Sequence, residues 1–283
     1  MGRRYDTVSL LTDYGTKDEF VGVIKSVLRD LAPDAVAIDL THEVEPHDVR
    51  GGSLTLARCI QYVAPGVVLA VVDPGVGTAR RAIAVEIADG AAVLVGPDNG
   101  LLAPAVAMAG GAGRAVELTN AAFHLPAPGQ TFAGRDVFAP VAAHLCNGVD
   151  LTEVGEPIDP AGVLPGVVPL SRVDGDHVIT EVLWVDRFGN AQLNVGPDDI
   201  EAIGELVQLR AHNVVRTATR ADTYGLIGTG RLGIVVDSYG LVSVCLDRQS
   251  AAAELGLAAG DAVVLSPPAD TPRGETTSVT LRR

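Results

Sequence analysis

The chain has 283 residues, of which 47% are hydrophobic and 20% charged, a composition typical of an ordered globular protein with room for one large and one smaller domain. Its formal net charge is −14, and the 21 Lys and Arg residues form no extended run. Because proteins bind a phosphate backbone through clustered Lys and Arg, nucleic acid is excluded as an expected partner.

The first half of the chain alternates short apolar runs with amphipathic segments. Runs rich in β-branched residues predict buried strands at 8–11, 35–40, 67–72 and 92–95. Apolar residues at spacings of three and four predict helices at 19–31 and 49–62, and a further helix-like stretch covers 136–145. This alternation is typical of an α/β fold, here a mostly parallel sheet flanked by helices.

The segment 156–169 (EPIDPAGVLPGVVP) holds four prolines and two glycines, which is typical of a linker. We therefore predict an N-terminal α/β domain at 1–160 and a C-terminal domain at 170–283. Short strands are expected at 178–185, 206–209, 232–236 and 241–246, and a short helix at 250–255. This pattern favours a small β-barrel or sandwich.

Polar turns follow three of the predicted N-terminal strands, at the points where the strands end. Asp13 lies in the turn TDYG, Asp73 in DPGVG and Asp98 in GPDNG. Because the carboxyl ends of the strands line the ligand crevice of an open α/β sheet, we expect these turns to surround one site. Any one of them alone is more typical of an ordinary turn.

Asp73 and Arg80 are separated by a glycine-containing loop. The loop lacks the Lys-Ser/Thr ending of a Walker loop and the third glycine of a dinucleotide fingerprint, so it does not indicate phosphate binding. A carboxylate and a guanidinium at this spacing can form a bidentate pair that holds a water molecule. The alternative is an ion pair that only braces the loop.

Aromatic, amide and carboxylate side chains recur in the C-terminal half. Asp186 and Asn190 lie in the segment DRFGN, Tyr224 comes later, and Ser238 and Tyr239 precede a glycine. Aromatic faces and amides suit a purine, and a carboxylate suits an ammonium or sulfonium group. The alternative is that these aromatic residues only fill a tapered barrel core.

The sequence predicts no metal and no cofactor. The six histidines show no HExxH spacing, and His42 and His47 are better explained as hydrogen-bonding loop residues. The absence of a GxSxG motif disfavours a serine hydrolase.

Three isolated cysteines without CxxC spacing fit a cytoplasmic protein. No apolar stretch approaches the ~20 residues that span a bilayer, so no membrane partner is expected.

Six motifs in order resemble those of one family, the S-adenosylmethionine (SAM) hydroxide adenosyltransferases, or SAM hydrolases, which are related to the SAM-dependent fluorinase and chlorinase. The motifs cover nearly the whole chain and read LTDYG, VDPGVGT, GPDNG, FAGRDVF, DRFGN and SYG. The resemblance implies an N-terminal α/β domain, a C-terminal β-barrel, and a homotrimer with active sites where one subunit's N-terminal domain meets a neighbour's barrel. It also implies hydrolysis of SAM to adenosine and L-methionine.

The resemblance further implies the role of each site residue. Asp13 is expected to bind the ribose hydroxyls, and Phe132 to wall the ribose pocket. Asp186 and Ser238 are expected to bind the methionine amine and carboxylate, and Asn190 and Tyr224 the adenine. Tyr239 and Ala251 are expected as additional contributors.

The resemblance also implies a catalytic set of three residues, an Asp, an Arg and a His, with which the hydrolases of this family position and activate water. Asp73 and Arg80 match the first two places, but Ala133 stands where the hydrolases have His. Ala133 is either a natural variant or a deliberate substitution. Loss of a general base typically lowers the rate by about 10²–10⁴-fold, so turnover is expected to suffer more than substrate binding.

Three other functions compete with hydrolysis. A SAM-dependent halogenase fits the small residue at position 133, although the Asp73 carboxylate would repel a halide by ~4 kcal/mol at contact if the effective dielectric is near 20. A catalytically silent SAM-binding module is the second alternative. A nicotinamide oxidoreductase is a distant third, because the glycine fingerprint is missing.

Overall fold

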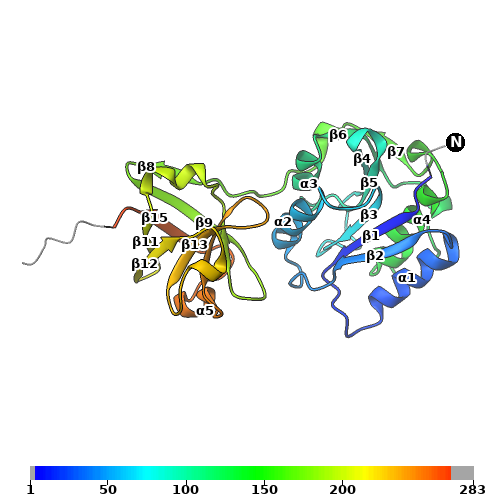
Figure 1. Ribbon diagram of the computed structural model, residues 1–283. Coiled ribbons are helices and arrows are strands. Elements are labelled where there is room, and N and C mark those ends of the chain that lie inside the picture. Colours follow the sequence, from blue (N-terminus) through cyan, green and yellow to red (C-terminus); the bar gives the residue numbers. More distant parts are fainter. Residues whose placement is uncertain (1–3, 269–283) are drawn as a thin grey trace, which may run out of the picture. The chain divides into compact units, whose positions relative to one another are not determined.

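The computed structural model describes residues 4–268. The chain forms two compact units, the first ending at Val168 and the second beginning at Pro169 (Figure 1). Each unit has its own hydrophobic core. In the described part of the chain, no helix combines the length and the apolar character needed to span a membrane.

The first unit is built on one seven-stranded sheet. Its strands, in spatial order, are β2 (Val36–Thr41), β1 (Thr7–Thr12), β3 (Gly66–Val71), β5 (Ala92–Pro97), β4 (Ala82–Ile87), β6 (Ala112–Glu117) and β7 (Glu156–Ile158). The strands from β2 to β5 run parallel to one another, whereas the pairs from β5 to β7 are antiparallel. The predicted α/β fold is confirmed, with an antiparallel extension that the sequence patterns did not indicate.

Helices cover both faces of this sheet (Figure 1). The four helices are α1 (Phe20–Leu31), α2 (Val49–Cys59), α3 (Ala103–Met108) and α4 (Ala139–Cys146). Leu10 packs in a core cluster with residues of α1 and α4, whereas the next residue, Leu11, packs in a cluster with residues of α2 and α3. Because successive strand residues point to opposite faces, strands buried on both faces read as continuous apolar runs.

The second unit is a closed seven-stranded β-barrel. The strands, in order around the ring, are β9 (His177–Val185), β10 (Ala191–Leu193), β14 (Val242–Leu246), β13 (Leu232–Val236), β12 (Val214–Arg220), β11 (Leu206–Ala211) and β15 (Ala262–Ser266). The ring closes because β9 pairs with both β10 and β15. The short strand β8 (Arg172–Asp174) pairs with β9 outside the ring, and the helix α5 (Ala251–Leu255) follows β14. The structure thus confirms a barrel.

Short helical turns connect these elements. They are η1 (Ala88–Gly90), η2 (Ala121–Phe123), the π-helical turn η3 (Gly134–Phe138), η4 (Leu151–Glu153), η5 (Pro160–Gly162), η6 (Asp198–Ile203) and η7 (Tyr224–Leu226). The stretch 136–145, expected to be helical, thus starts in the π-turn η3 and continues as α4. Single π-turns within helices are rare and occur often at functional sites.

Candidate functional site

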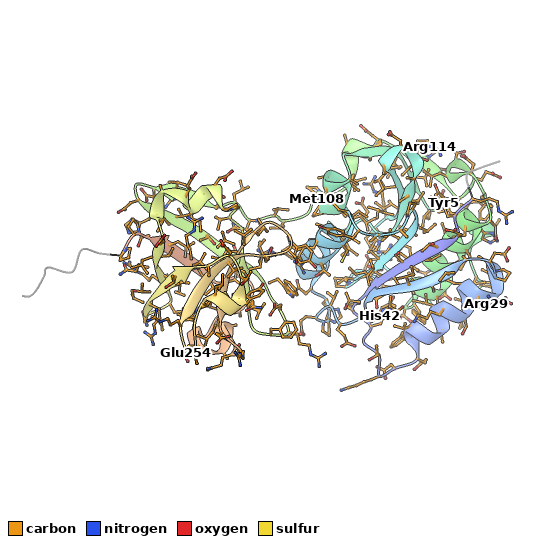
Figure 2. The ribbon with its side chains drawn as sticks, viewed as in Figure 1. Tyr5, Arg29, His42, Met108, Arg114 and Glu254 are labelled. Carbon is orange, nitrogen blue, oxygen red and sulfur yellow. The ribbon has the colours of Figure 1, made fainter. Side chains whose placement is uncertain are left out.

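The turn after β1 holds Asp13 in a fixed position. The Asp13 Oδ2 atom accepts a hydrogen bond of 2.9 Å from the backbone N–H of His47, which has a positive φ of 69°. Behind this turn, the buried His42 ring makes a 2.8 Å hydrogen bond between its Nδ1 and Thr12 Oγ1, and its Nε2 lies 3.0 Å from Asp39 Oδ1. His42, labelled in Figure 2, therefore connects the ends of β1 and β2.

Asp73 and Arg80 form the bidentate pair that their spacing suggested. The Arg80 Nε donates to Asp73 Oδ1 at 2.8 Å, and the Arg80 Nη2 donates to Asp73 Oδ2. The side chains of Asp73 and Arg80 are 5% and 14% exposed, respectively. The guanidinium carbon of Arg80 also lies 5.3 Å from the ring centre of the buried Phe138. A rigid carboxylate of this kind can orient a polar group without reorganising its own partners.

Three aromatic rings pack together beside this pair. The ring centres of Tyr14 and Phe132 are 5.7 Å apart, those of Phe20 and Phe132 are 5.0 Å apart, and both pairs meet edge to face. Burial raises the pKa of the Tyr14 phenol, and the negative charges of Asp13 and Asp73 raise it further. The predicted residues Asp13, Asp73 and Phe132 therefore surround one tyrosine.

Ala133 lines a pocket of about 560 Å³ within the first unit. Arg80 lines the same pocket from the loop before β4, and Asp136 lines it from η3. Both oxygens of Asp136 accept hydrogen bonds from its neighbour Arg135, at 2.6 and 3.0 Å. The structure thus places position 133 and Arg80, the partner of Asp73, on the walls of one pocket.

Asp98, in contrast, serves the architecture of the unit. Its Oδ2 accepts a 2.9 Å hydrogen bond from Arg81 Nε, and its Oδ1 accepts a 2.8 Å hydrogen bond from the Leu164 backbone N–H. Arg81 also donates to the Gly162 carbonyl oxygen. Asp98 therefore ties the segment after β7 to the sheet, although its position after a strand resembles those of Asp13 and Asp73.

On the barrel, Asp186 organises its own turn. Its Oδ1 accepts hydrogen bonds of 2.8 Å from the backbone N–H groups of Phe188 and Asn190, and its Oδ2 accepts one of 2.7 Å from Asn190 Nδ2. Ala251, the first residue of α5, is fully buried in the barrel core. The next residue, Ala252, donates its backbone N–H to the Gly189 carbonyl oxygen, so α5 adjoins this turn.

Asp237 organises the turn that carries Ser238 and Tyr239. Its Oδ1 accepts from the backbone N–H of Tyr239 at 2.9 Å, and its Oδ2 accepts from Gln192 Nε2 at 2.6 Å. Burial raises the pKa of the Tyr224 phenol, with smaller contributions from Cys245, Asp237 and Asp186. Asp186, Tyr224 and the Asp237 turn therefore lie close together.

The candidate residues thus form two groups, one on each unit. The first contains Asp13, Asp73, Arg80, Phe132 and Ala133, and the second contains Asp186, Asn190, Tyr224, Ser238 and Tyr239. Sequence reasoning assigned no role to Tyr14, Phe20 or Asp237, although Tyr14 lies within the motif LTDYG and Asp237 directly precedes SYG. Within residues 4–268, no cluster of three His, Cys, Asp or Glu residues has the arrangement of a metal site.

Both units match known protein domains. Residues 8–155 match the SAM hydroxide adenosyltransferase N-terminal domain, and residues 180–264 match the corresponding C-terminal domain. An (R)-S-adenosyl-L-methionine hydrolase of Salinispora tropica is 44% identical over 254 residues, which cover 90% of this chain and 95% of the relative. A protein of the same name from Thermus thermophilus is 40% identical over 89% of this chain and 96% of the relative.

A solved structure of an uncharacterized conserved protein from Thermotoga maritima superposes with a TM-score of 0.85 at 35% identity, covering 92% of this chain and 99% of that one. More distant relatives carry the name fluorinase. One from an Actinoplanes strain is 28% identical over 72% of this chain and 76% of the relative.

Proposed function

Because the chain belongs to the SAM hydroxide adenosyltransferase family, we propose that it hydrolyses S-adenosyl-L-methionine to adenosine and L-methionine. Hydrolysis is the activity named for relatives that are 40% and 44% identical over most of the chain. The observation that carries the proposal is the bidentate Asp73–Arg80 pair, which adjoins a pocket large enough for water and part of a substrate.

The reaction needs a well-placed water molecule more than it needs a strong base. The sulfonium of SAM leaves the ribose 5′ carbon as a neutral thioether, taking the electron pair of the C–S bond. Water attacks the same carbon in line from the opposite side and loses one proton. Asp73, fixed by Arg80, accepts a hydrogen bond from this water and so orients its lone pair.

The remaining candidate residues bind the substrate. Asp13 accepts hydrogen bonds from the ribose hydroxyls, because its carboxylate is held at the end of β1 by His47. Phe132 covers the ribose. On the barrel, Asp186 and Ser238 bind the methionine amine and carboxylate. Asn190 and Tyr224 bind the adenine, and Tyr239 completes the pocket. Ala251 is buried in the barrel core, so it contributes only by packing beneath the Asp186 turn. The prearranged turns at Asp186 and Asp237 support these roles.

We also propose that the enzyme is a cytoplasmic homotrimer that uses SAM as its substrate and needs no cofactor. The trimer rests on the family resemblance, and light scattering of the purified protein would test it. The cytoplasmic location is supported by the cysteines: Cys59, Cys146 and Cys245 are all free thiols.

The test is an assay of purified protein with SAM, in which adenosine and methionine are separated by chromatography. Adenosine should form in large excess over the protein. Asp73→Asn should lower the rate by about 10²-fold or more, because the amide keeps the shape of the carboxylate but loses its charge. Circular dichroism should confirm that this variant folds, since the substitution leaves the Arg80 charge without its partner.

The same assay distinguishes the competing functions. A halogenase is favoured by one specific observation, the small Ala133 side chain on the pocket wall beside Arg80. Chlorinated adenosine formed in quantity with added chloride would overturn hydrolysis as the main activity. SAM binding by calorimetry without release of adenosine would instead identify a silent binding module.

A further inference from the structure

The pocket beside Ala133 contains few groups that could accept a proton. Among the described lining residues, the proton acceptors are the carboxylate of Asp136 and the imidazole of His124. Both oxygens of Asp136 are already bonded to Arg135, and both oxygens of the neighbouring Asp73 are bonded to Arg80. A carboxylate paired with arginine in this way is a weak base, because the guanidinium stabilises its charged form.

His124 differs from these carboxylates because one of its ring nitrogens makes no hydrogen bond within the described residues. The Nε2 atom of His124 is buried and has no hydrogen-bond partner among the described residues. Leaving a buried polar atom without a hydrogen bond destabilises a folded protein, so such atoms call for an explanation. One such explanation is a role that is filled only when water and substrate are bound.

We propose that His124 accepts the proton from the attacking water during SAM hydrolysis. This inference rests on the proposed function. Water gives its proton to the imidazole as its oxygen bonds to the ribose 5′ carbon, and the C–S electron pair leaves with methionine. One positive charge thus disappears from sulfur as another forms on His124, and the proton later passes to solvent. The ring that accepts the proton lines the same pocket as Arg80 and Ala133.

The surroundings keep His124 neutral before the reaction. Burial lowers the pKa of its imidazole below the ordinary value, so the ring is an unprotonated base at neutral pH. The charged groups that line the same pocket are Arg80, paired with Asp73, and Asp136, paired with Arg135. A titratable group on α4, His144, lies beside the same segment, because its ring packs edge to face on the adjacent Phe123 with centres 5.0 Å apart.

A proton-accepting role for His124 is compatible with the alanine at position 133, where the family's hydrolases have a histidine. His124 and Ala133 line one pocket from two different segments, before and within the FAGRDVF motif. A histidine at either position would therefore present an imidazole to the same space. The two positions are expected to be interchangeable as sources of the base.

A set of variants of the full chain tests this interchange. His124→Ala should lower kcat by at least about ten-fold, with a smaller change in KM, because general-base loss acts on the chemical step. Adding Ala133→His to this variant should restore most of the lost rate. The acid limb of the pH–rate profile, where activity falls as His124 is protonated, should vanish in His124→Ala.

His144→Ala is the matched control, because His144 is also half-buried, has a lowered pKa and packs on the same segment. It should leave the acid limb in place. If the parent chain hydrolyses SAM but His124→Ala keeps its kcat and pH profile, the inference is wrong while the function stands. If Ala133→His fails to restore a folded His124→Ala, the role of His124 is structural. If the parent chain forms no adenosine, the proposed function itself fails.

Discussion

The aromatic wall beside Asp73 depends on a glycine that leads into η3. A Cβ atom built on Gly134 would lie 2.5 Å from the Tyr14 hydroxyl and 3.1 Å from Ile24 Cδ1. Both neighbours are held in place, Tyr14 by the rings of Phe20 and Phe132 and Ile24 by the core. A side chain at position 134 would therefore push against Tyr14, whose phenol is close enough to Asp13 and Asp73 for their charges to raise its pKa.

We predict that Gly134→Ala lowers the free energy of unfolding by about 1–3 kcal/mol, the usual cost of overpacking a core, and reduces hydrolysis by displacing Tyr14. Gly22→Ala is the control, since a Cβ at this exposed position of α1 meets nothing within 4 Å. The control should be neutral or slightly stabilising, because alanine favours a helix. Urea unfolding measures the free energy of unfolding of the two variants. If both variants are equally stable, the proposed clash is contradicted.

At the scale of elements, the segment after β7 is held to the sheet by one buried carboxylate. Asp98→Ala removes the acceptor for both Arg81 and the Leu164 N–H, so it should lower the free energy of unfolding by about 2–4 kcal/mol. The exposed pair Arg172–Asp174 provides the control, because Asp174→Ala should cost less than about 1 kcal/mol. A thermal melt that shifts equally for both substitutions would show that Asp98 is not an anchor.

The parallel strands β1, β3 and β5 could be predicted because they are buried and read as apolar runs. The strand β2 was also predicted from an apolar run, but it is an edge strand with mostly exposed residues, so the expectation that it is buried was wrong. The start of α1 was predicted to within one residue. The strands β4, β6 and β7 were not predicted. The strand β6 (AGRAVE) contains a glycine and two charged residues, and β7 (EPI) lies inside the proline-rich segment expected to be a linker. Proline is tolerated there because β7 is an edge strand, which has one side free of ladder hydrogen bonds.

Parts of the site were likewise beyond sequence reasoning. The pairing of Asp73 with Arg80 is local, so their spacing predicted it. The placement of His124 depends on how the segment 121–130 folds over the loop 77–80, and no spacing rule connects these two stretches. Asp98 misled because it follows a strand as Asp13 does, whereas its Oδ2 accepts from Arg81 and its Oδ1 accepts from the distant Leu164 backbone N–H.

At the scale of the whole molecule, the second unit has its own hydrophobic core and a closed ring of strands, as an independently folding domain does. Its main core cluster contains only residues between Val178 and Leu265, and its seven strands close on themselves without an exposed edge inside the ring. We therefore predict that a fragment of residues 169–283 folds alone, with β-type circular dichroism and a cooperative urea transition. The fragment should form no adenosine from SAM, because Asp73, Arg80 and His124 belong to the other unit.

Val244→Asp provides the control for this fragment, since Val244 is fully buried in the barrel core and a carboxylate there would have no partner. This substitution should abolish the cooperative transition. A parent fragment that unfolds without cooperativity would show that the ring depends on the first unit for its stability. The closed hydrogen bonding would then be insufficient to stabilise the barrel, and the free energy would have to come from contacts beyond the core cluster.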